Sequence, residues 1–85
     1  MRPIEIFRQV ADQHGAMVAR PRKNAPGEYD AKPYFTGSHR GWVAVDAFTA
    51  SAVVRVYNAL SPANREKFDK LSLTRAVDIT WSVLK

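Results

Sequence analysis

Residues 46–60 read Asp46-Ala-Phe-Thr-Ala-Ser-Ala-Val-Val-Arg-Val-Tyr-Asn-Ala-Leu60, and this stretch decides the fold class. Its apolar residues recur at helical spacing, as at Phe48, Ala52 and Val56. Its valines favour a strand, but a stretch this long without a turn signal is typical of a helix. Asp46 suits the N-cap position, because its carboxylate can accept hydrogen bonds from the first backbone N–H groups. We therefore expect a helix over 46–60.

Two further helices are expected between this stretch and the last residue. Ser61 and Pro62 form a start signal, since serine caps helices and proline suits the first helical position. They predict a helix that ends at Leu71. Ser72 is the next expected cap, and the segment after it repeats apolar residues about every four positions, at Leu73, Val77, Trp81 and Leu84.

The first helix is expected at the N-terminus. Pro3 suits its first position, and its apolar face is formed by Ile4, Phe7, Val10 and Ala11. Gly15 is the expected stop, with His14 near the helix end.

The segment between residues 16 and 45 is interrupted by glycine and proline and cannot be all helix. Residues 16–20, 34–36 and 42–45 are predicted strands. The last two flank a glycine-bounded turn at 37–41, which is typical of a β-hairpin. Because an isolated hairpin is marginal in water, it must pack on the helices or pair with 16–20. Residues 21–27, with two prolines and a glycine, are expected to form an exposed loop.

These elements predict an α+β fold in a single domain, residues 1–85. Its order is an N-terminal helix, a short antiparallel β-hairpin or three-stranded sheet, and three C-terminal helices. Most of the core should come from large apolar residues on the helices, namely Phe7, Phe48, Val56, Leu60, Phe68, Leu71, Val77 and Trp81.

Composition limits the partners and the compartment. The chain carries a formal charge of +5 and has a pI of about 10, so a polyanionic or acidic partner is plausible. It contains no cysteine, which excludes disulfides and thiolate metal sites. Its apolar runs are too short to cross a bilayer, and residues 1–10 lack the apolar stretch of a signal peptide. We expect a soluble, cytoplasmic protein that contacts no membrane.

The residues that usually carry catalysis are scarce. The only histidines, His14 and His39, do not fall into a metal-ligand spacing. Ser38 precedes His39, but adjacency in sequence does not build a nucleophile–base pair. The four glycines do not form a phosphate-binding loop. We therefore expect neither an enzyme nor a metal or other cofactor.

Basic and aromatic residues are concentrated between residues 20 and 42. Arginine and lysine neutralise phosphates and exposed aromatic rings stack on bases, whereas tyrosine, tryptophan and arginine also anchor protein interfaces. We predict a contact surface centred on 20–23 and the turn 38–42. The predicted partner-binding residues are Arg20, Arg22, Lys23, Lys32, His39, Arg40 and Trp42.

Two alternatives remain open for these segments. The aromatic residues Tyr34, Phe35 and Trp42 could instead be packed under the helices, since strand alternation directs some of them inward. A helix-turn-helix over 62–84 is a second way to bind nucleic acid, with Thr74, Arg75 and Asp78 toward the groove. Against it, its turn lacks glycine, and Asp78 would repel phosphate.

The pattern from Asp46 to Leu60, with Asn64-Arg65 and Lys67-Phe68 after it, resembles uncharacterised small accessory proteins encoded by bacteriophages and prophages. The similarity extends from Trp42 to the closing helix and involves core and cap residues. It implies a non-enzymatic protein of a bacterial host's cytoplasm that binds and modulates a bacterial or phage macromolecular machine, of which a host-defence system is one example. The alternative is a nucleic-acid-binding protein that uses the basic-aromatic segment or the C-terminal helix pair.

Overall fold

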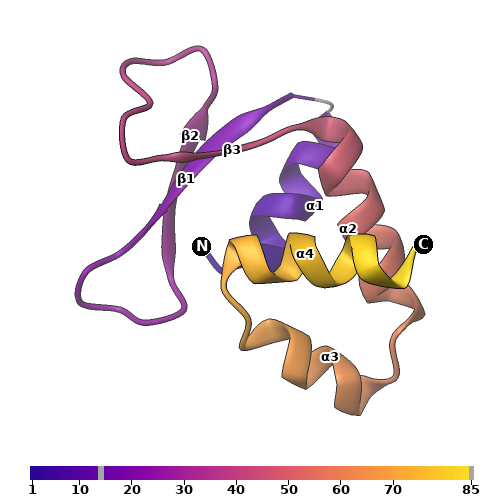
Figure 1. Cartoon of the computed structure of the whole chain (residues 1–85). Coiled ribbons are helices and arrows are strands. Elements are labelled where there is room, and N and C mark those ends of the chain that lie inside the picture. The colour runs from indigo at the N-terminus through magenta and orange to yellow at the C-terminus, as the bar shows by residue number, and fades with distance from the viewer. Residues whose placement is uncertain (14, 85) are drawn as a thin grey trace.

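A computed structural model describes residues 1–13 and 15–84. Along the chain its elements are α1 (Pro3–Gln13), β1 (Met17–Pro21), β2 (Tyr29–Pro33), β3 (Val43–Val45), α2 (Ala47–Ala59), α3 (Pro62–Asp69) and α4 (Leu73–Val83). The α+β fold class is therefore confirmed, with the three-stranded form of the sheet. The sheet lies at one end of the molecule and the helices at the other (Figure 1).

The three C-terminal helices begin at the caps that the sequence predicts. Asp46 accepts a hydrogen bond from the Thr49 amide at 2.7 Å, which starts α2. Ser61 and Ser72 accept from the amides three residues on, at 3.3 and 3.2 Å, and so start α3 and α4. Each side-chain oxygen satisfies an amide that would otherwise lack a partner at the helix start. At the other end of the chain α1 ends at Gln13, and the predicted helical position of His14 lies outside the described residues.

The strand pairing differs from the predicted hairpin. β1 lies in the centre and pairs antiparallel with both β2 and β3, so the order is β2-β1-β3. The prediction of a strand at 34–36 was wrong, because these residues form a turn. The strand lies instead at 29–33, where Tyr29 is buried and its hydroxyl accepts the Leu73 amide at 3.0 Å. That buried contact fixes β2 against the start of α4.

The core lies between the helices and one face of the sheet. α1 contributes Ile4, Ile6, Phe7 and Val10 to it, and the sheet contributes Met17, Ala19, Tyr29 and Val45. Among the predicted core residues Phe7, Val56 and Phe68 are buried, and Leu60, Leu71 and Val77 are partly buried against it.

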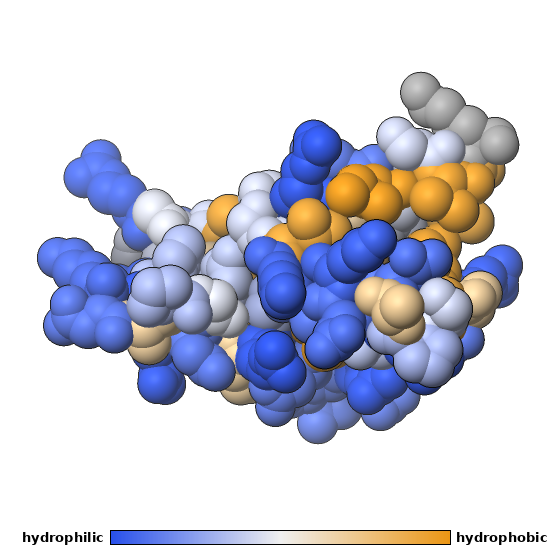
Figure 2. Space-filling model, turned by 90° about the horizontal axis from the view of Figure 1, so that it is seen from below, coloured by the Kyte–Doolittle hydropathy of each residue, from blue (hydrophilic) through white to orange (hydrophobic). Residues whose placement is uncertain are grey.

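The prediction for Phe48 was wrong, because its side chain is 77% exposed, and Trp81 is only partly buried. Both lie on the flank of their helices, just outside the packed face. Seen from below, the molecule is largely hydrophilic at the sheet end and hydrophobic near the C-terminal end of α4 (Figure 2). Among the described residues, no helix has both the length and the apolar character that crossing a membrane requires.

Candidate functional site

The sheet register places a set of charged residues on the face turned away from the helices. Side chains alternate between the two faces of a strand. Met17 and Ala19 of β1 face the core, so Val18 and Arg20 face outward. The register pairs Arg20 with Asp30 and Val18 with Lys32. Asp30 and Lys32 therefore share the outer face with Arg20.

Trp42 joins this set from the residue before β3. Continuing the β1–β3 register by one position places it opposite Arg20. The Arg20 guanidinium lies 4.5 Å from the centre of the indole ring and the Lys32 ammonium 4.6 Å from it. Each is within the range of a cation–π interaction. The ring thus holds two cations from neighbouring strands close together.

Loop 34–42 covers part of this outer face. Lys32 Nζ donates a hydrogen bond to the Ser38 carbonyl at 3.1 Å, which ties the loop to β2. Val18 has no exposed surface, although it lies on the face opposite to the helices. The loop, Trp42 and the aliphatic part of Lys32 are positioned to exclude water there. We call the surface made of Arg20, Asp30, Lys32, Trp42 and loops 22–28 and 34–42 the basic-aromatic face.

A single carboxylate, Asp30, faces two arginines on this surface. Arg22 Nε donates to Asp30 Oδ1 at 2.7 Å, and Arg20 Nε lies 3.7 Å from Asp30 Oδ2. The hydrogen bond from Arg22 holds the pKa of the Asp30 carboxyl below its ordinary value. The same bond raises the pKa of the Arg22 guanidinium. One negative charge cannot neutralise two positive ones, so this cluster remains cationic.

The arginines also line the hollow beside the β1–β2 connection. Its volume is about 480 Å³, and it is lined by Arg20, Pro21, Arg22, Lys23, Asn24, Ala25 and Asp30. Lys23 is exposed and makes no ion pair within the described part of the chain. The hollow is therefore an open, positively charged depression that an anionic group can enter.

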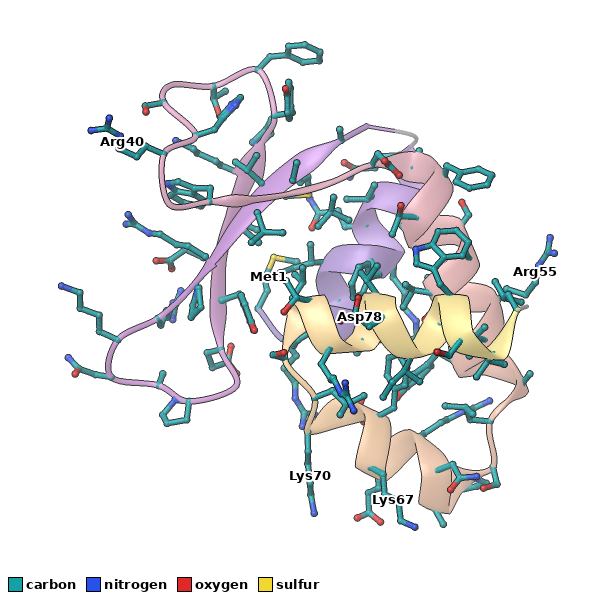
Figure 3. The ribbon with its side chains drawn as sticks, viewed as in Figure 1. Met1, Arg40, Arg55, Lys67, Lys70 and Asp78 are labelled. Carbon is teal, nitrogen blue, oxygen red and sulfur yellow. The ribbon has the colours of Figure 1, made fainter. Side chains whose placement is uncertain are left out.

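Loop 34–42 presents an aromatic residue to solvent. Phe35 is 91% exposed, and Tyr34 packs edge-on against it with ring centres 5.3 Å apart. Tyr34 also contacts the His39 ring at 4.5 Å, and His39 Nε2 is buried without a hydrogen-bond partner among the described residues. Arg40 projects outward from the same loop (Figure 3). Phe35 thus protrudes from a loop whose other aromatic residues hold it in place.

The predicted partner-binding residues therefore fall into two groups. Arg22, Lys23 and Arg40 are exposed and directly accessible. Arg20 is also exposed, but together with Lys32, His39 and Trp42 it makes contacts that shape the face from within. Sequence reasoning missed two participants, Asp30 as the carboxylate that orients the arginines and Phe35 as the exposed ring. Only the charge of Asp30 and the apolar character of Phe35 within a glycine-bounded loop could have indicated them.

The structure also places the residues named in the two alternatives, namely aromatic residues packed under the helices and a helix-turn-helix over 62–84. Phe35 is not packed under the helices, and Tyr34 and Trp42 are at most partly buried. Thr74, Arg75 and Asp78 are exposed on α4.

The residues that the structure describes contain no group of three histidine, cysteine or acidic side chains arranged to hold a metal ion. Comparison with protein-family models, curated proteins and solved structures gave no match to this chain.

Proposed function

We propose that the protein is a small, non-enzymatic binding protein that modulates a bacterial or phage macromolecular machine, and that it recognises an acidic surface on a protein of that machine. The observation that carries this proposal is the 91% exposure of Phe35 on a loop fixed to the sheet by Lys32. A large exposed ring on an ordered loop loses little conformational entropy on binding. It is therefore suited to enter an apolar depression of a partner.

The charges around Phe35 indicate what should surround that depression. Residues 16–45 carry more basic than acidic side chains, namely Arg20, Arg22, Lys23, Lys32 and Arg40 against Glu28 and Asp30. Aromatic and arginine side chains dominate the energetic centres of protein interfaces, and complementary charges speed the encounter. We infer a partner with an apolar site and an acidic rim.

Direct binding of nucleic acid is a second candidate, supported by the cationic hollow at Arg20, Arg22 and Lys23. Phosphate groups could neutralise the charge that Asp30 leaves uncompensated. The Trp42 ring, however, is already in contact with two cations. Phe35 is therefore the ring best exposed for stacking on a base, which is a small platform compared with those of single-strand binders.

The test is capture of partners from a bacterial lysate with charge-reversal variants. Lys23→Glu/Arg40→Glu reverses two exposed cations of the basic-aromatic face. Lys67→Glu/Lys70→Glu makes the same charge change in the last turn of α3 and at its C-cap. We expect the first variant and Phe35→Ser to lose a partner that wild type and the α3 variant both retain. Retention of every captured partner by the face variants would overturn the proposed surface.

Nuclease treatment of the lysate separates the two candidates. A protein partner should still be captured after the treatment, and purified DNA and RNA oligonucleotides should bind weakly. If capture depends on nucleic acid, and oligonucleotide affinity falls linearly with salt on a log–log plot, the second candidate replaces the first.

A further inference from the structure

A second exposed phenylalanine lies in the first turn of α2, outside the proposed contact surface. Phe48 of α2 is 77% exposed and stacks on Trp81 of α4, with ring centres 5.8 Å apart and ring planes 22° apart. The pair bridges two helices that already pack against each other. Trp81 is partly buried and Phe48 lies over it in water, and a contiguous exposed apolar surface is typical of a site that another molecule covers.

The surroundings of this pair form an apolar patch with a shallow depression. The depression has a volume of about 280 Å³ and is lined by Phe48, Ser51, Ala52, Arg55, Trp81 and Leu84. Leu84 is 45% exposed and Val83, beside it at the end of α4, is 60% exposed. We call the six lining residues the apolar patch.

The charges at this patch differ from those of the basic-aromatic face. Arg55 lines its depression, whereas Asp78 lies outside it, one helical turn before Trp81, and lines the neighbouring depression against β3. Both are exposed, and neither makes an ion pair within the described residues. Asp78 lies near the middle of α4, whereas Arg55 projects beyond its C-terminal end (Figure 3). The patch itself thus carries one positive side chain, Arg55, and a negative side chain, Asp78, lies beside it on α4.

This arrangement is complementary to itself. In a dimer with a two-fold axis, both copies use the same surface. Each contact between two different residues therefore occurs twice. We propose that a second copy of this chain covers the apolar patch. The two Phe48–Trp81 stacks meet at the centre, and Arg55 of each copy pairs with Asp78 of the other.

The charge distribution of the whole chain favours a second copy at this position. Two chains with a formal charge of +5 repel each other, most strongly where the basic residues gather at the sheet end. Helices α2 and α4 carry three charged side chains, Arg55, Arg75 and Asp78, and lie on the side of the molecule away from loop 22–28 (Figure 1). Two copies can approach there with the least repulsion.

The first experiment measures the mass of the purified chain by sedimentation over a wide concentration range. Because the patch is small beside the roughly 20–30 residues per side of a standard interface, we expect a dissociation constant in the micromolar range. Phe48→Ser should shift the chain to monomer. Phe35→Ser removes the more exposed phenylalanine, which lies in the basic-aromatic face, and should leave the dimer unchanged.

The second experiment tests the paired charges. Arg55→Asp and Asp78→Arg should each weaken the dimer at least tenfold, because each places like charges opposite one another twice. An equimolar mixture of the two variants should form a mixed dimer, since every contact then joins opposite charges. The double variant Arg55→Asp/Asp78→Arg should also dimerise. Both positions are exposed, so circular dichroism should show unchanged folding.

These experiments distinguish a second copy of the chain from another molecule that covers the apolar patch. A wild-type chain that is monomeric at millimolar concentration overturns the proposal, including the case in which the patch binds a different protein. A dimer that survives Phe48→Ser, or folded charge variants that do not associate when mixed, also overturns it. The proposal is independent of the basic-aromatic face, because Phe35→Ser tests that face alone.

Discussion

At the residue scale, Trp42 and Asp30 organise the same cations by different means. The indole ring contacts Arg20 and Lys32 through its π-electrons, and such contacts leave the charges available to a partner. Asp30 orients Arg20 and Arg22 through its carboxylate and cancels one charge. The basic-aromatic face is therefore ordered by its own side chains without being neutralised.

The pairing of Asp30 with Arg22 predicts a pH dependence. The hydrogen bond from Arg22 holds the pKa of Asp30 below its ordinary value of 3.8. The folded state therefore binds a proton at Asp30 less readily than the unfolded state does. The stabilisation is fully present above about pH 4 and is lost as the pH falls through the lowered value. It should be small, since both side chains are exposed.

Carboxyl-carbon NMR titration measures this directly. The pKa of Asp30 should lie below 3.8 in the wild type and should rise toward its ordinary value in Arg22→Gln. Urea unfolding should show that the stability advantage of wild type over Asp30→Asn shrinks as the pH falls below about 4. A wild-type pKa at or above the ordinary value would contradict the pairing.

At the element scale, the helix starts were predictable and the strand pairing was not. Asp46, Ser61 and Ser72 act on amides three residues away, so short-range sequence contains the signal. The pairing of β1 with β2 depends on Tyr29, whose partner Leu73 lies 44 residues further along. Asp30 and Lys32 point outward from β2 and make its sequence polar, so the segment was not predicted as a strand.

The candidate site was predictable to a similar extent. Composition indicated the basic and aromatic zone, but the contacts of Trp42 with Arg20 and Lys32 follow from a register that is set by distant residues. Helical spacing likewise placed Phe48 near the core without deciding which flank of α2 is covered. Its exposure depends on how α4 crosses α2, and the local pattern does not encode that crossing.

Among the helices, α3 has the fewest buried side chains. Its buried residue is Phe68, which packs on Tyr57 with ring centres 5.6 Å apart. Arg65 donates through Nε to the Tyr57 carbonyl at 3.1 Å and through Nη2 to the Asn58 carbonyl at 2.8 Å. These carbonyls belong to the last turn of α2, where the regular helical hydrogen bonding ends. Arg65 thus ties the start of α3 to the end of α2.

Removal of this tie should loosen α3 selectively. Arg65→Gln loses the two-pronged hydrogen bonding, at a cost of about 1 kcal/mol, so amide exchange in α3 should become about fivefold faster. Amides of α1, which packs on α2, should keep their rates. Lys67→Gln removes an exposed cation from the same helix and should change little. Equal exchange in wild type and Arg65→Gln would show that Arg65 does not contribute to the attachment of α3.

At the scale of the whole molecule, the two proposed contact surfaces differ in physical character. The sheet end is basic and presents Phe35, whereas the α2–α4 end carries fewer charged side chains and presents Phe48. Figure 1 places these ends on opposite sides of the molecule. A dimer through the α2–α4 end would leave both basic-aromatic faces outward, so one dimer could engage two sites on a partner and gain avidity.

This separation of charge and apolar contact predicts distinct kinetic effects on binding to the captured protein partner. Long-range charge acts on the encounter, so Lys23→Glu/Arg40→Glu should lower the association rate constant at low salt, and rising salt should diminish the difference from wild type. Phe35 acts only after contact, so Phe35→Ser should mainly raise the dissociation rate constant, by about tenfold or more. Surface plasmon resonance with the chain in solution at concentrations that keep it monomeric measures both constants.

The control is Phe48→Ser, which should change neither rate constant under these conditions, because Phe48 lies outside the basic-aromatic face. An effect of Phe35→Ser on association alone, or a charge variant whose association is as fast as wild type at low salt, would show that the partner does not approach through the basic-aromatic face.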